Sequence, residues 1–191
     1  MKRIVIFASG NGTNAENIIR YFQKSSLAKV VLVLSNKSDA KVLTRAKNLG
    51  VPARHFSKET LHSGEVLKTL TEFNPDLIVL AGFLLKLPEN IISEFPGKII
   101  NIHPALLPKH GGKGMYGNFV HQAVIQAKDK ESGISIHYVN DEYDSGAIIF
   151  QKSVSITPED TPESLAKKIH ELEYKWFPKV IEELIKKPDK S

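Results

Sequence analysis

The sequence predicts one α/β domain, spanning residues 1–191, built on a mostly parallel twisted sheet with helices on both faces. Two observations lead to this prediction. In the first half of the chain, short runs rich in valine and isoleucine alternate with longer helical segments, which is the order of βαβ units. In the second half, two strand-like segments follow each other directly, which predicts an antiparallel addition in the carboxyl-terminal part.

The strands are placed by short apolar runs and by the turn residues that end them. In the first half, buried strands are expected at residues 3–7, 30–34, 77–80 and 98–101. Helices are expected between them, at residues 14–23, 40–49 and 65–73. In the second half, strands are expected at residues 134–139 and 147–156, on either side of a turn at residues 144–146.

A last helix is expected to begin at Pro162, because apolar residues then recur at helical spacing. The residues that form this apolar face are Leu165, Ile169, Leu172 and Trp176. Pro178 is expected to bend or end the helix, since proline lacks the backbone N–H that a helix requires, and the helical pattern continues beyond it at residues 181–184. Trp176 and Phe177 are interpreted as core residues.

The amino-acid composition excludes several classes of protein and favours one class of ligand. The chain has no cysteine, which excludes disulfide scaffolds, thiolate nucleophiles, iron–sulfur clusters and cysteine-based zinc fingers. A formal net charge of +5 favours anionic partners. Small phosphorylated or carboxylated ligands are expected, and nucleic acid is not, because no basic segment interleaved with aromatic residues is present.

Membrane association is not expected. The longest apolar stretch, at residues 77–85, has about half the length that a bilayer requires. The apolar run after the amino-terminal Met-Lys-Arg is too short for a signal peptide. We therefore expect a cytoplasmic protein.

A glycine-containing segment, SGNGTNA at residues 9–15, follows the first strand and opens the first helix. Its backbone N–H groups and the positive end of the helix predict an anion site. Thr13 and Glu16 also match a capping box. A nicotinamide dinucleotide is disfavoured because no acidic residue ends the second strand, and the Gly-Lys-Ser/Thr of a P-loop is absent. A phosphate monoester is the favoured ligand.

Asn101 and His103 lie at the end of an expected strand, where open α/β sheets bind their ligands. They are two residues apart, so their side chains point to the same side of an extended backbone, and both can donate hydrogen bonds. Asp144 lies in the turn between the last two strands. We hypothesise that Asp144 lies close to His103, where its carboxylate would raise the pKa of the imidazole.

Four motifs occur in the order found in the folate-dependent formyltransferases, which the chain resembles over residues 1 to about 185. They are SGNGTN at 9–14, LAGF at 80–83, NIHPALLP at 101–108, and the GISIHYV segment at 133–139 that leads to Asp144 and Gly146. The resemblance implies a Rossmann-like formyltransferase fold. It also implies transfer of a formyl group from the cosubstrate 10-formyltetrahydrofolate to the amino group of glycinamide ribonucleotide, in de novo purine synthesis.

Site residues follow from the resemblance, motif by motif. It implies a catalytic trio of Asn101, His103 and Asp144. It implies that the ribonucleotide is held by Gly12, Thr13, Asn14 and Glu173. It implies that the folate is bound by Leu84, Leu85, Lys86, Leu87, Asn101 and Val139, and Lys58 lies near a basic position that the family uses for the folate.

The implied chemistry suits these residue types. Attack of the substrate amine on the formyl carbon creates an oxyanion, which Asn101 and protonated His103 would stabilise while Asp144 keeps His103 charged. No covalent enzyme intermediate and no metal are implied. The stretch at 109–118 contains four glycines and is interpreted as a mobile loop beside the site, with the hypothesis that it acts as a lid.

Alternative functions remain open at this stage. A formyltetrahydrofolate deformylase, which is a hydrolase, and a methionyl-tRNA formyltransferase share the catalytic segment, but each is expected to carry a further domain. A non-catalytic phosphate- or nucleotide-binding module is disfavoured by the presence of the whole trio. A metal enzyme is disfavoured because the histidines lack the spacing of paired ligands. Either a monomer or a homodimer is compatible with the sequence.

Overall fold

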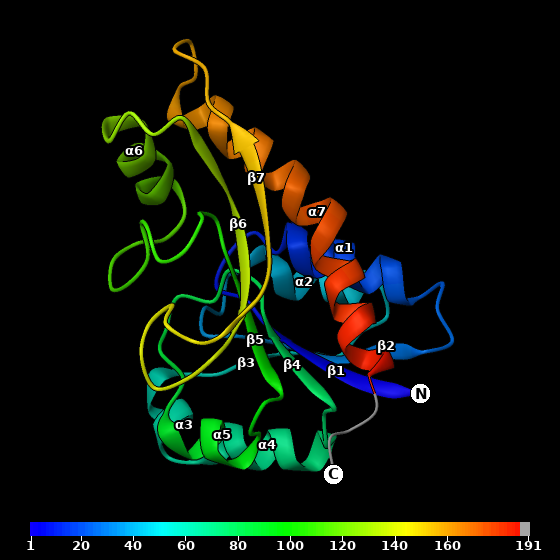
Figure 1. Cartoon of the computed structure of the whole chain (residues 1–191). Coiled ribbons are helices and arrows are strands. Elements are labelled where there is room, and N and C mark those ends of the chain that lie inside the picture. Colours follow the sequence, from blue (N-terminus) through cyan, green and yellow to red (C-terminus); the bar gives the residue numbers. More distant parts are fainter. Residues whose placement is uncertain (188–191) are drawn as a thin grey trace.

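Seven strands form one sheet in the order β3-β2-β1-β4-β5-β6-β7, in a computed structural model that describes residues 1–187 (Figure 1). Strands β1 to β5 pair in parallel, and β6 and β7 are added antiparallel. The predicted fold class, a single α/β domain with an antiparallel carboxyl-terminal addition, is confirmed. The predicted domain span also includes residues 188–191, which lie outside the described residues, so the boundaries stay a prediction.

The strands are β1 (Lys2–Phe7), β2 (Ala28–Ser35), β3 (Ala53–His55), β4 (Leu77–Leu80), β5 (Ile99–His103), β6 (Glu131–Tyr138) and β7 (Ile148–Ser155). The helices are α1 (Thr13–Phe22), α2 (Lys41–Asn48), α3 (Lys58–His62), α4 (Glu65–Phe73), α5 (Glu89–Glu94), α6 (Asn118–Gln126) and α7 (Pro162–Lys186). The sequence patterns did not predict β3, α3, α5 and α6. The first three are only three to six residues long, too short for a clear period.

The sheet divides the core into two layers because successive side chains of a strand point to opposite faces. Ile4 and Ile6 of β1 belong to the layer that α1, α2, α6 and α7 cover. Val5 and Phe7 belong to the layer under α3, α4 and α5. Figure 1 shows α7 and α1 on one side of the sheet and α3, α4 and α5 on the other.

Helix α7 is one continuous element, and its buried face differs in part from the prediction. It continues through Pro178 to Lys186, and Pro178 itself is buried inside it. The helix survives the missing hydrogen bond because Phe177, Val180 and Ile181 bury apolar surface on both sides of the proline. Of the predicted apolar face, Leu165 and Ile169 are buried, whereas Leu172 and Trp176 are only partly buried. The Trp176 ring packs against Phe150, with ring centroids 5.1 Å apart.

The predicted capping box at the start of α1 is wrong. Gly12 caps the helix in a left-handed conformation, with φ of 74°, and no side chain accepts a hydrogen bond there. The Glu16 carboxylate instead pairs with Arg20 and Arg45. Strong guanidinium partners therefore outcompete the local backbone for this side chain.

Within residues 1–187, no helix combines the length and the apolar character needed to cross a membrane.

Candidate active site

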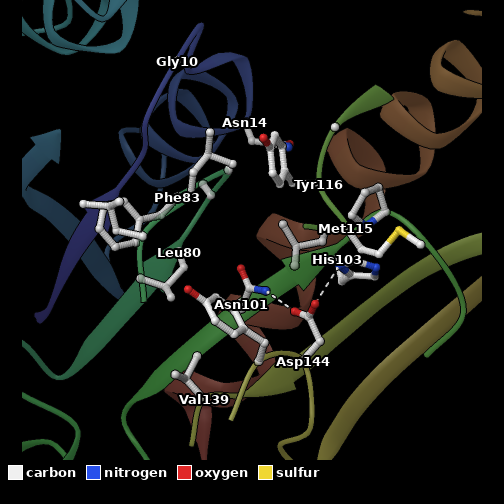
Figure 2. Close-up of a pocket in the computed structure, with 18 of the residues that line it drawn as sticks. Gly10, Asn14, Leu80, Phe83, Asn101, His103, Met115, Tyr116, Val139 and Asp144 are labelled. Carbon is white, nitrogen blue, oxygen red and sulfur yellow. Dashed lines mark hydrogen bonds and ion pairs between the residues drawn. The ribbon is translucent and has the colours of Figure 1, made fainter. Parts of the chain in front are cut away.

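A cavity of about 560 Å³ opens where the parallel strands end at their carboxyl termini. Its wall includes Leu80 from the end of β4 and Asn101 and His103 from β5 (Figure 2). In the strand order, β2 and β3 lie on one side of β1, and β4 and β5 lie on the other, so the strand order reverses between β1 and β4. This is the topological switch point at which open α/β sheets bind ligands.

One end of the cavity is formed by the glycine segment and the start of α1. Gly12, Thr13 and Asn14 all line the cavity, as predicted for the ribonucleotide site. A side chain at position 12 would collide with Val42, because an ideal Cβ there lies 2.3 Å from Val42 Cγ2. Glycine is therefore required at this turn for two reasons, the positive φ and the close approach of α2.

A buried carboxylate lies at the same end. Glu173 of α7 is 5% exposed and accepts a hydrogen bond from Asn14 Nδ2 at 2.8 Å. His170 Nδ1 lies 2.9 Å from the same oxygen, Glu173 Oε2. This hydrogen bond to Glu173 raises the pKa of His170 above its usual range, although burial opposes it. Glu173 was predicted to contact the ribonucleotide, whereas His170, its partner in this polar wall, was not predicted.

The other end is apolar. The predicted folate residues Leu84, Leu85, Lys86, Leu87 and Val139 all line it. The loop after β4 is tied to the glycine segment, because Leu84 N donates to Ser9 Oγ at 2.9 Å and Ser9 N donates to Gly82 O at 3.0 Å. The two ends of the cavity therefore have a fixed separation.

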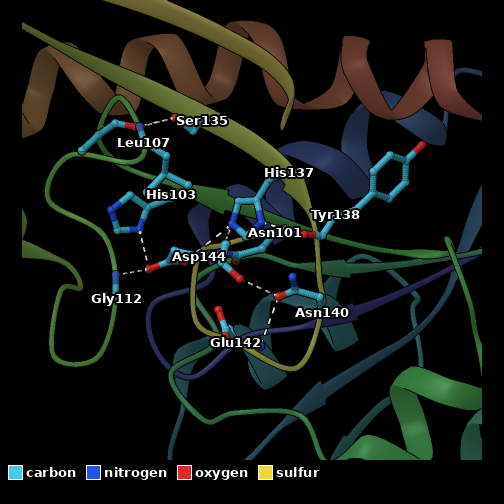
Figure 3. Close-up of polar contacts among 12 residues, drawn as sticks. Asn101, His103, Leu107, Gly112, Ser135, His137, Tyr138, Asn140, Glu142 and Asp144 are labelled. Atoms are coloured by element: carbon cyan, nitrogen blue, oxygen red, sulfur yellow. Dashed lines mark hydrogen bonds and ion pairs between the residues drawn. The ribbon is translucent and has the colours of Figure 1, made fainter. Parts of the chain in front are cut away.

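The trio of Asn101, His103 and Asp144 meets between the two ends (Figure 3). Asp144 Oδ2 lies 3.5 Å from His103 Nδ1, and Asp144 Oδ1 lies 3.5 Å from Asn101 Nδ2. The alternation of β5 places the first two side chains together. Asp144 reaches them from the loop between β6 and β7, with a left-handed φ of 52°.

The protonation behaviour of His103 differs from the prediction. Burial lowers the pKa of His103 below its usual value, and this effect outweighs the opposing influence of the Asp144 charge and of the hydrogen bond to the His110 carbonyl. The sequence identified the charge correctly, but His103 is only 3% exposed, and burial disfavours the imidazolium.

Asp144 remains a carboxylate. Burial acts to raise its pKa, but hydrogen bonding with His137, the charge of His103 and the Gly112 N–H together lower the pKa below its usual range. The backbone bond from Gly112 N to Asp144 Oδ2 is 2.9 Å long.

His137 lies in the GISIHYV motif, but no function was predicted for it from the sequence. Its Nδ1 donates to the Tyr138 carbonyl at 2.8 Å, and its Nε2 lies 3.1 Å from Asn101 Nδ2 and 3.6 Å from Asp144 Oδ1. His137 lies directly opposite Asn101 in the β5–β6 register. It therefore fixes the orientation of the Asn101 amide.

Residues 112–117 line one side of the cavity, so the glycine-containing stretch lies beside the site as predicted, and its role as a lid stays a prediction. His121 of α6 also lines the cavity and was not predicted. Lys58 is different, because it begins α3 and does not line the cavity. Its predicted contact with the folate stays a prediction without geometric support. Within residues 1–187, no group of three or more metal-ligating side chains is arranged to hold a metal ion, and the predicted absence of a metal stays a prediction.

Comparison with known proteins places this fold and site in a family. The formyl transferase family matches residues 2–181. The chain therefore belongs to the formyl transferase family, and the resemblance seen in its motifs is confirmed.

Several relatives of the chain share the name of one member of that family. The chain is 40% identical to the phosphoribosylglycinamide formyltransferase of Haemophilus influenzae, over 95% of this chain and 86% of that protein. It is 39% identical to the chloroplastic phosphoribosylglycinamide formyltransferase of Arabidopsis thaliana, over 94% of this chain and 64% of that protein. The crystal structure of phosphoribosylglycinamide formyltransferase from Bacillus halodurans superimposes with a TM-score of 0.88 and 37% identity, covering 97% of this chain and 96% of that one.

Proposed function

We propose that this protein transfers the formyl group of 10-formyltetrahydrofolate to the amino group of glycinamide ribonucleotide. One observation carries the proposal: a single cavity joins a glycine turn at a helix amino terminus to an apolar pocket, and the trio lies between them. A phosphorylated acceptor suits the first end, and a pteridine ring suits the second. The names of the relatives agree with this assignment.

In the proposed complex, the N–H groups at the start of α1 bind the acceptor phosphate, and Asn14 and Glu173 contact the rest of the ribonucleotide. The folate lies along the loop after β4 and against Val139. This arrangement brings the acceptor amine and the formyl carbon together at the trio, and holding two reactants in this way lowers the barrier by itself.

The reaction then needs stabilisation of a negative charge. Attack of the amine on the formyl carbon forms a tetrahedral oxyanion. Asn101 Nδ2–H can donate to it, and so can His103 Nδ1 once that nitrogen is protonated, because His103 Nε2 is bonded to the His110 carbonyl. Each such donor contributes about 10²- to 10³-fold in rate. The nascent negative charge favours the imidazolium in the same direction as Asp144, so His103 gains proton affinity as the intermediate forms. As the new C–N bond forms, the attacking nitrogen loses a proton, which His103 Nδ1 accepts beside Asp144. His103 then gives this proton to the folate N10 as the bond from the formyl carbon to N10 breaks.

The test is formyl transfer, followed by the absorbance of the released folate. Purified protein receives a 10-formylfolate donor with or without glycinamide ribonucleotide. Release only with the ribonucleotide is expected. Release without it would support the deformylase alternative. No release from a folded protein would support a silent binding module.

His170 gives the acceptor site a predicted pH dependence. Its pKa is raised by Glu173, so below that pKa it is an imidazolium that attracts the acceptor phosphate, and above that pKa the attraction is lost. The KM for the ribonucleotide is therefore expected to rise about two- to fivefold as pH increases through this range, the effect of an exposed ion pair. Initial rates measured over a pH series that starts below the usual pKa of histidine and extends upward measure this rise.

The matched control for this prediction is His170→Gln, which keeps a hydrogen-bonding side chain of similar length without a titrating ring. Its KM for the ribonucleotide should be high and flat over the same pH range. The KM for the folate should be unaffected in both proteins. An unchanged pH dependence in His170→Gln would contradict the role of His170.

The proposal includes small-molecule substrates only, with no nucleic-acid or membrane partner. We propose that the protein acts in the cytoplasm. It is proposed to be a monomer or a homodimer, and sedimentation of the purified protein can distinguish these two oligomeric states.

A further inference from the structure

An ion pair outside the cavity is connected to His103 through one backbone carbonyl. The His110 ring Nε2 lies 2.8 Å from Asp129 Oδ2, and the His110 carbonyl lies 2.8 Å from His103 Nε2. Neither His110 nor Asp129 lines the cavity. We propose that Asp129 is a positioning residue, which holds the His103 imidazole in place through His110. The inference deepens the proposed function and rests on it for its kinetic consequence.

The first argument is that one short segment contacts both ionisable members of the trio. The His110 carbonyl accepts from His103. Two residues later, the Gly112 N–H donates to Asp144 Oδ2 at 2.9 Å (Figure 3). A rotation of the backbone at residue 110 would displace both contacts together. The position of this segment therefore sets the 3.5 Å separation between His103 Nδ1 and Asp144 Oδ2.

The second argument concerns the backbone of His110. Its φ is 53°, a left-handed conformation that is unfavourable for a residue with a Cβ. Such a conformation persists when the surrounding contacts determine it, and it is found preferentially at functional sites. The contact that anchors the His110 side chain is Asp129, since both side chains are largely buried, at 15% and 21% exposed.

Asp129 is itself held firmly. It follows α6, and its backbone N–H donates to the Val124 carbonyl of that helix at 3.4 Å. Its hydrogen bond with His110 is the largest influence that lowers its pKa, so it remains a carboxylate. Lys109 lies 3.7 Å from the other oxygen but is 73% exposed, and such a pair contributes little. His110 is therefore the main partner of Asp129.

The contact has a consequence for His103. A carbonyl oxygen can only accept, so Nε2 of His103 must carry a hydrogen, and Nδ1 is the nitrogen that faces Asp144. Loss of the anchor would free the ring to rotate and to change tautomer. Because His110 and Asp129 lie outside the cavity, substrate binding should be little affected while turnover falls.

The test is Asp129→Ala. The expected result is a kcat about ten- to a hundredfold lower, the range for a small displacement of a reacting group, with the KM of both substrates within about twofold of wild type. Asp129→Asn supplies the conservative rescue, because its amide oxygen can still accept from His110, and it should retain most of the wild-type kcat. The matched control is Asp160→Ala, which removes a carboxylate that pairs with Lys168 and does not line the cavity, and it should leave kcat unchanged.

A second readout does not depend on activity. In ¹⁵N-histidine NMR spectra of the full chain without substrates, Asp129→Ala should shift the His103 Nδ1 and Nε2 resonances toward tautomer averaging, and Asp160→Ala should not. Unchanged His103 resonances in a folded Asp129→Ala protein would overturn the proposal, whatever the activity. An inactive wild-type protein would refute the proposed function, and the NMR comparison would still decide the role of Asp129.

His110→Gly tests whether Asp129 acts through the His110 side chain or through the stability of the whole protein. Glycine adopts the left-handed conformation without cost, so it removes the imidazole while keeping the backbone path. If Asp129 acts through His110, adding Asp129→Ala to His110→Gly should change kcat no further. A multiplicative loss in the double variant would show that Asp129 acts by another route and would overturn the proposal.

Discussion

Asp144→Asn is expected to lower kcat by about 10²- to 10⁴-fold, the range for loss of acid–base assistance, while the protein folds almost normally. Asparagine keeps the size of the side chain and an acceptor for the Gly112 N–H. It removes the negative charge 3.5 Å from His103 Nδ1, so the imidazolium loses the interaction that opposes its burial. Single-turnover rates of formyl transfer measure the effect, and circular dichroism checks the fold.

Asp141→Asn is the matched control. Asp141 lies in the same loop between β6 and β7 but is exposed and does not line the cavity. Its kcat should equal that of wild type. Wild-type turnover in a folded Asp144→Asn protein would remove Asp144 from the proposed mechanism.

Gly12→Ala is expected to weaken binding of the ribonucleotide strongly, with a KM about tenfold higher or more, and to destabilise the fold by about 2–3 kcal/mol. The added Cβ would lie 2.3 Å from Val42 Cγ2 and 2.7 Å from Val42 Cα. Because the second contact is backbone, α2 or the glycine turn must move, and the turn carries the N–H groups proposed to bind phosphate. Initial-rate kinetics and thermal unfolding measure the two effects.

Gly64→Ala is the control for Gly12→Ala, because it introduces the strain of a positive φ without a collision like the one with Val42. Gly64 has φ of 93°, but a Cβ there would meet no atom within 4 Å. It should lose only about 1 kcal/mol, with an unchanged KM for the ribonucleotide. Equal effects of the two substitutions on stability and KM would contradict the importance of the approach to Val42.

Much of the fold could be predicted because buried parallel strands are continuous apolar runs, as β4 (Leu77–Leu80) illustrates. Strand β3 could not be predicted in this way, since its three residues are half-buried or exposed at the sheet edge. Pro178 was expected to interrupt α7 because propensity is local. The burial of Phe177 and Ile181, which keeps the helix intact, is a tertiary effect.

In the site, too, features set by local sequence could be predicted, and features set by tertiary contacts could not. The trio and the two ends of the cavity lie where the motifs and strand ends placed them. The pKa of His103 could not be predicted, because the sequence reveals the nearby charge and hides the depth of burial. The connection from Asp129 to His103 was also hidden, because it runs through the backbone carbonyl of His110, which no residue identity encodes.

The sheet separates the two core layers, and each end of the single cavity is supported by a different layer. Asn14 and Glu173, at the acceptor end, project from α1 and α7 over one layer, whereas Leu87 and Val139, at the folate end, pack with the other. Substitutions that reshape one pocket can therefore accumulate without repacking the hydrophobic layer beneath its neighbour. Donor and acceptor specificity are in this sense separately evolvable, and a variant selected against folate analogues is expected to keep its affinity for the ribonucleotide.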